Sequence, residues 1–76
     1  MSSLVTQMIV AEKYGVRLNM EQLAAVLKLT VPSLYNQVSS GKLQIPTYMD
    51  QGKRWADYRA VADYLDDCAD KATAAI

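Results

Sequence analysis

Apolar residues recur at helical spacing on both sides of a short interruption in residues 19–41. Leu23, Val26 and Leu27 form one apolar face, and Leu34 and Val38 lie one helical turn apart on a second face. Polar and turn-forming residues separate the two groups. The pattern therefore predicts two short amphipathic helices that pack against each other.

Capping residues mark the ends of both helices. Asn19 followed three residues later by Gln22 is a capping box, and Thr30 is a second N-cap residue with Pro32 in the first turn behind it. Gly41 is the residue type that ends a helix. Two short helices joined by a turn are typical of a helix-turn-helix, whose second helix usually enters the DNA major groove.

The N-terminal segment has its own apolar pattern. It predicts a helix within residues 1–15, capped by Ser2 or Ser3 and ended by Gly15. We expect its apolar face to pack in the core, because a small domain needs every apolar surface it can bury. Contact with a second copy is the alternative use. The face consists of Leu4, Val5, Met8 and Ile9.

Residues between and after the helices read as extended chain. Residues 16–18 alternate and predict a short strand that needs a partner. Residues 43–49 also alternate, with Pro46 restricting that run to a sheet edge or a bulge. A turn at 50–52 and a returning strand at 53–56 complete a predicted hairpin over residues 43–56.

This hairpin has two interpretations. Its returning strand begins with Lys53 and Arg54 and follows the second helix closely, as a DNA-binding wing would. In the second interpretation, the segment is an ordinary solvent-facing hairpin in which Trp55 covers the core.

The last predicted helix spans residues 57–72. Asp57 is its N-cap, and an apolar side runs along Val61, Leu65, Cys68 and Ala72. Cysteine at this spacing is usually a small buried hydrophobic residue. We expect residues 72–76 to fray or to extend the helix weakly.

Composition narrows the function classes. A chain of 76 residues predicts one domain over 1–76, mainly α with a small β-hairpin, and leaves little room for an enclosed active site. With no histidine and a single cysteine, we expect no metal site and no cofactor. We also expect no enzymatic role, because Ser33, Ser39 and Ser40 have no histidine to act as base. No apolar run of about 18 residues and no secretory signal pattern occur, which predicts a cytoplasmic protein.

Charge is balanced overall but unevenly distributed. Residues 1–56 carry six lysine or arginine side chains and three carboxylates, whereas residues 57–76 carry two and five. The two parts have formal charges of +3 and −3. This asymmetry favours a dipolar molecule with one face suited to phosphate and an acidic last helix held away from it. The alternative is an ordinary solvated surface.

Several segments together resemble a known family. The chain resembles the winged helix-turn-helix of excisionases and MerR-type regulators in three segments: MEQLAAVLKLTVPSLYNQVSSGKLQIP (20–46), GKRW (52–55) and DYRAVADYL (57–65). MIVAEKYGVRLNMEQL (8–23) is similar to the start of small prophage regulators such as the pyocin activator. The resemblance implies a phage or prophage DNA-binding protein of the bacterial cytoplasm. Such proteins control promoters or act as recombination directionality factors.

The resemblance also implies which residues contact double-stranded DNA. The second helix would present its exposed face to the bases, the hairpin would reach the minor groove or backbone, and Lys42 would lie near phosphate. Asn36 would pair with adenine, and Tyr35 or Val31 would meet a thymine methyl group. The expected DNA-binding residues are Val31, Pro32, Ser33, Tyr35, Asn36, Ser39, Lys42, Lys53 and Arg54.

The chain departs from the family pattern in its charges. Family members commonly carry arginine or lysine where this chain has Val31, Asn36 and Ser39, and glycine where it has Lys28. With few phosphate contacts, one copy would bind weakly, so we expect a homo-oligomer, for example head to tail on repeated sites. The neutral second helix also favours an alternative: a protein-interaction module or antirepressor that binds another regulator instead of DNA.

Overall fold

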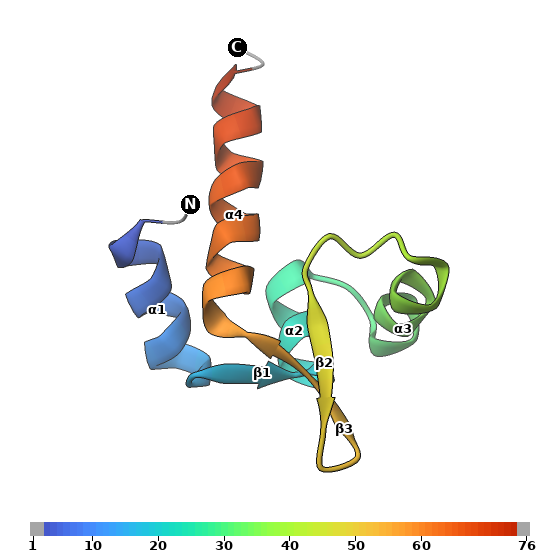
Figure 1. The fold of residues 1–76 in the computed structure, drawn as a ribbon. Coiled ribbons are helices and arrows are strands. Elements are labelled where there is room, and N and C mark those ends of the chain that lie inside the picture. Colours follow the sequence, from blue (N-terminus) through green and yellow to red (C-terminus); the bar gives the residue numbers. More distant parts are fainter. Residues whose placement is uncertain (1–2, 75–76) are drawn as a thin grey trace.

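Four helices and a small antiparallel sheet make up the chain in the computed structural model, which describes residues 3–74 (Figure 1). Helices contribute most of the residues, in agreement with the predicted fold class. The elements, in chain order, are α1 (Leu4–Tyr14), β1 (Arg17–Asn19), α2 (Met20–Leu27), α3 (Val31–Ser40), β2 (Thr47–Asp50), β3 (Lys53–Asp57) and α4 (Tyr58–Ala74).

The predicted caps of α2 and α3 are confirmed. The Asn19 Oδ1 accepts the Gln22 backbone N–H at 2.8 Å, and the Gln22 Oε1 accepts the Asn19 backbone N–H at 3.0 Å. The Thr30 hydroxyl accepts the Ser33 backbone N–H at 3.3 Å. Local side-chain chemistry therefore determines where each helix begins.

Both helices end in left-handed residues. Gly41 closes α3 with φ of 72°, as predicted, and Lys28 closes α2 with φ of 60°. A non-glycine residue is uncommon in this conformation, because its Cβ approaches the backbone closely. Lys28 thus occupies a position that glycine would fill with less strain.

The sheet has three strands in the order β1-β3-β2, all antiparallel. Asn19 lies opposite Trp55, so β3 is the partner that the predicted 16–18 strand required. The hairpin turn has positive φ at Gln51 (54°) and Gly52 (77°). Only Gly52 was expected there.

The prediction that residues 43–46 belong to the hairpin is wrong. These residues form no strand, and β2 begins at Thr47. Pro46 has no N–H for a ladder, and Ile45 is buried in the core with 2% of its surface exposed. The alternation of this segment therefore reflects an extended connection that inserts Ile45 into the core.

The core lies where the first turns of α4, the sheet and α2 meet. The largest side chains with no exposed surface come from β1, α2, α3 and α4: Leu18, Leu23, Leu34 and Val61. Half-buried residues such as Val31 and Val38 pack against this core from α3. Helix α3 is therefore held mainly by one side.

Helix α1 does not bury the predicted face. Ser3 caps it as expected, whereas Ser2 lies outside the described residues. Val10 is buried and Tyr14 packs on the core, and hydrogen bonds from Ser3 and Thr6 to Asp66 of α4 fix this orientation. A helix at the edge of the molecule buries only the side turned to its neighbour. The exposed fractions are 69% for Leu4, 66% for Val5, 60% for Met8 and 62% for Ile9.

Helix α4 begins as predicted but extends beyond the rest of the fold (Figure 1). Val61 is buried and Leu65 half-buried, whereas Cys68 and Ala72 are exposed. The expectation of a buried Cys68 is therefore wrong. The apolar spacing continues past the point where the chain provides anything to pack against.

Asp57 caps α4 and sets a pH dependence. Its carboxylate accepts the Arg59 backbone N–H at 2.8 Å, and the Arg59 side chain lowers the pKa of Asp57 below its ordinary value of 3.8. The ionised form stabilises the fold above pH 3.8, and this contribution disappears as pH falls through the lower folded pKa. We expect Asp57→Ala to reduce the free energy of unfolding by about 1 kcal/mol at pH 7.

Urea unfolding at pH 7 and at pH 2.5 measures this effect. The difference from the wild type should shrink at the lower pH. Asp70→Ala, at an exposed position of the same helix, is the control and should change stability by less than about 0.5 kcal/mol. An equal loss in both variants would contradict the capping role.

None of the helices within residues 3–74 combines the length and the apolar character needed to cross a bilayer.

Candidate nucleic-acid interface

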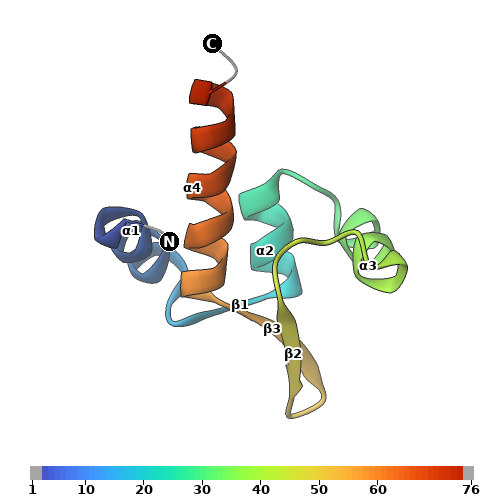
Figure 2. The ribbon, with the colours of Figure 1, turned by 45° about the horizontal axis from the view of Figure 1, so that its top comes forward.

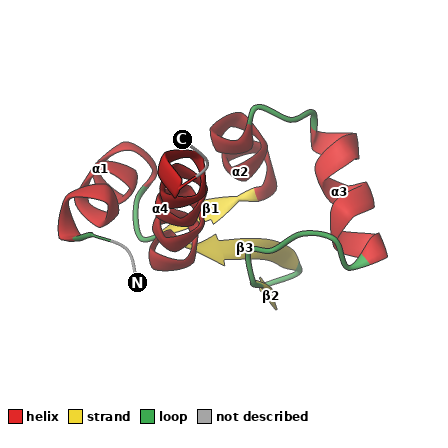
Figure 3. Cartoon of the chain, turned by 90° about the horizontal axis from the view of Figure 1, so that it is seen from above, coloured by secondary structure: helices red, strands yellow, loops and turns green. Residues whose placement is uncertain are grey.

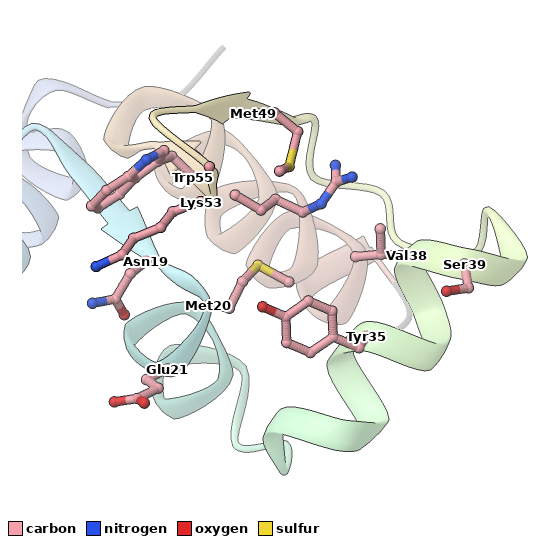
Figure 4. A pocket seen from close by; sticks show the side chains of 11 residues that line it. Asn19, Met20, Glu21, Tyr35, Val38, Ser39, Met49, Lys53 and Trp55 are labelled. Atoms are coloured by element: carbon pink, nitrogen blue, oxygen red, sulfur yellow. The ribbon is translucent and has the colours of Figure 1, made fainter.

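A groove of about 700 Å³ separates α3 from the β2–β3 hairpin (Figure 4). Tyr35, Val38 and Ser39 of α3 form one side, and hairpin residues form the other. The β1–α2 junction closes the end. The remaining lining residues are Asn19, Met20, Glu21, Met49, Gly52, Lys53, Arg54 and Trp55.

One face of α3 is exposed and uncharged. Leu34 is fully buried beneath the helix, which turns the opposite side outward. Within residues 3–74, no hydrogen bond engages the side chains of Asn36 or Ser39. Their polar atoms are thus available to a ligand. The predicted contact residues that are exposed on this helix are Pro32, Ser33, Tyr35, Asn36 and Ser39.

Val31 does not belong to that face. It was predicted to be exposed, but it is half-buried and packs against the core beside Leu34. Val31 lies three positions before Leu34, so the two side chains share one side of the helix. The expected contact between Val31 and a thymine methyl group is therefore unsupported by its position.

Arg17 holds the hairpin in place from β1. Its Nη1 donates to the Asp50 carboxylate at 2.7 Å, and its guanidinium lies 3.9 Å from the centre of the Trp55 ring. The Trp55 indole N–H donates to the Asp50 carbonyl at 3.2 Å. The Asp50 carboxylate, and then the Tyr48 hydroxyl, raise the pKa of Arg17, so its charge is retained. These contacts orient the hairpin relative to α2.

Trp55 therefore has a different role from the predicted alternative. It is half-buried and lines the groove beneath Arg17 instead of joining the core cluster.

Two cations of the hairpin face the groove. Lys53 follows the turn and is exposed, whereas Arg54 is half-buried and donates to the Thr47 hydroxyl at 2.9 Å. Glu21 is the acidic residue among the groove-lining side chains. The lining therefore carries one more positive than negative charge.

Lys42 lies elsewhere. It lines a separate pocket of about 200 Å³ together with Gln37, Gln44 and Tyr64. The structure thus brings four predicted contact residues together in one groove: Tyr35, Ser39, Lys53 and Arg54. The other five do not line it: Val31, Pro32, Ser33, Asn36 and Lys42.

Several groove residues were not among the predicted contacts: Asn19, Met20, Glu21, Val38, Met49, Gly52 and Trp55. Pairing of β1 with β3 brings the first three beside the hairpin. The alternation at residues 16–18 is the signal that indicated a strand, but it does not specify the partner.

The acidic helix is remote from the groove. Helix α2 lies between α4 and α3, as two further views show (Figures 2 and 3). The four aspartates of α4 are thus kept apart from the exposed face of α3. Among the described residues, no group of three or more acidic, cysteine or histidine side chains is arranged to hold a metal ion.

Comparisons of the chain with protein families, curated proteins and solved structures gave no match.

Proposed function

We propose that this protein binds duplex DNA as a winged helix-turn-helix, with α3 as the recognition helix and the β2–β3 hairpin as the wing. The observation that carries the proposal is the shared groove, in which Tyr35 and Ser39 of α3 lie opposite Lys53 and Arg54 of the hairpin. The resemblance to excisionases and MerR-type regulators supports a non-enzymatic role in the cytoplasm. That role is control of transcription or of recombination directionality in a phage or another mobile element.

The contacts divide into two kinds. Asn36 offers a donor and an acceptor that match the N6 and N7 atoms of adenine in the major groove, and Tyr35 offers apolar contact beside it. Lys53 and Arg54 offer positive charge to phosphates and carry no base preference. Specificity would reside in α3 and affinity in the hairpin.

Salt dependence tests the proposal directly. We expect about two phosphate contacts for each bound copy, from Lys53 and Arg54, so log K should fall with log salt with a slope of about −1.8 per copy. The affinity of one copy would then drop roughly 12-fold between 50 and 200 mM salt. Fluorescence anisotropy on duplexes from the neighbouring genomic region measures it. No binding at 50 mM salt would refute the proposal.

A second candidate is a protein-interaction module on the same fold. Exposed Tyr35, Tyr48 and Met49 beside an uncharged α3 favour it, because aromatic residues and methionine are enriched where proteins associate. A pulldown with the intact chain distinguishes the two functions. A stoichiometric partner that is lost with Tyr35→Ala, together with no DNA affinity at low salt, would establish the second candidate.

A further inference from the structure

The outer face of α1 carries a second apolar surface that the monomer leaves uncovered. Val10 and Tyr14 already anchor the inner face on the core, so Leu4, Val5, Met8 and Ile9 project away from it. A helix that is apolar on two opposite sides is typical of one that is buried on both. Four large side chains, each at least 60% exposed, approach the few hundred Å² that mark an interaction surface.

We infer that this outer face of α1 is a symmetric interface that packs against α1 of a second copy of the chain. The spacing supports a two-fold arrangement. The spacing of positions 4, 5, 8 and 9 is symmetric about the point between residues 6 and 7. In an antiparallel pair, Leu4 therefore meets Ile9 of the partner, and Val5 meets Met8 of the partner.

Charge also favours a second copy. Residues 3–11 contain no charged side chain, and the exposed Glu12, one turn after Met8, lies at the end of this face. In an antiparallel pair the two Glu12 side chains lie at opposite ends of the contact. The apolar residues between them therefore meet without desolvating a charge and without repulsion between like charges.

The contact area available on this face is small. A standard interface buries about 800 Å² on each partner. One face of an 11-residue helix is smaller than that, so the pair should be weak and reversible.

The pairing leaves the candidate DNA surface free. Helix α1 lies on the opposite side of α4 from α2 and α3 (Figures 1 to 3). A dimer through α1 would leave both α3 helices uncovered. The inference does not depend on DNA binding, because self-association is measured without DNA.

Sedimentation equilibrium of the full chain from about 1 to 500 µM tests the interface. We expect a monomer–dimer equilibrium that Met8→Glu weakens about 30-fold or more. Met49→Glu is the matched control, since Met49 is 59% exposed and Met8 is 60% exposed. It should dimerise like the wild type. A monomer at every concentration, or an equal effect of both substitutions, would overturn the inference.

Crosslinking tests the symmetry. In a Cys68→Ser background, Met8→Cys should join two chains through a short bifunctional maleimide, because the two copies of residue 8 lie near the two-fold axis. Met49→Cys should not. A dimer that fails to crosslink at residue 8 would instead indicate head-to-tail contact and would overturn the two-fold arrangement.

Discussion

Replacing Lys53 and Arg54 together by alanine is expected to weaken duplex-DNA binding about 60-fold at 0.1 M salt. Each phosphate neutralised by a lysine or arginine contributes about eightfold at this salt concentration through counterion release. The salt slope should also fall by about 2, and the loss should be similar for every DNA sequence. Fluorescence anisotropy with two unrelated duplexes measures both quantities.

A variant with the same change in net charge serves as the control. Lys13→Ala with Lys71→Ala removes two exposed cations, one from α1 and one from α4, neither of which lines the groove. This control should retain nearly all of the affinity. Lys53→Ala alone tests whether the loss comes from charge or from a change in the hairpin. Arg54 donates a hydrogen bond to Thr47 within the hairpin, whereas Lys53 is exposed and its removal takes away only charge. Equal losses in the double variant and the control would indicate attraction by overall charge only.

Leu34→Ala should reduce the free energy of unfolding by about 3 kcal/mol, since a fully buried leucine leaves a cavity when truncated. This is a large share of the stability of a domain of this size. The melting temperature should fall by roughly 15 °C. Urea and thermal unfolding followed by circular dichroism measure the loss.

The second substitution in this pair is Asn36→Ala. Asn36 lies on the same helix but is exposed, so its loss should change stability by no more than about 0.5 kcal/mol. The effects on DNA binding should be reversed: among folded molecules, Asn36→Ala should weaken DNA binding more than Leu34→Ala does. Asn36→Ala should also reduce the discrimination between bases by about 1–3 kcal/mol. A loss below about 1 kcal/mol for Leu34→Ala would show that α3 is not anchored through this residue.

Local chemistry made the centre of the chain predictable. Asn19, Gln22, Thr30 and Gly41 act on backbone atoms a few residues away, so their roles follow from sequence spacing alone. The exposed side of α3 follows equally from the spacing of the buried Leu34. The predicted bounds of both helices therefore agree with the structure.

Contacts between distant segments were not predictable in this way. The pairing of Asn19 with Trp55 and the ion pair of Arg17 with Asp50 join residues that lie more than 30 positions apart. No local pattern specifies such partners. The composition of the groove beyond α3 and the hairpin follows from these contacts.

Apolar spacing also does not specify what covers a face. The outer side of α1 and the Cys68 side of α4 have core-like patterns, yet both are exposed. These two faces could be buried only if another segment packed against them, and the fold places none there among the described residues. Val31 shows the reverse. It lies one helical turn before the buried Leu34, so its side chain packs against the core and not on the expected surface.

Amide chemical-shift mapping on ¹⁵N-labelled protein is the most direct test of the DNA-binding surface. A non-specific duplex at low salt suffices, because backbone contacts do not require a particular sequence. Shifts should concentrate on the exposed side of α3 and on residues 51–54 and should spare α1 and the last turns of α4. Shifts confined to α1 or α4, or none at all, would contradict the proposed recognition by α3 and the hairpin.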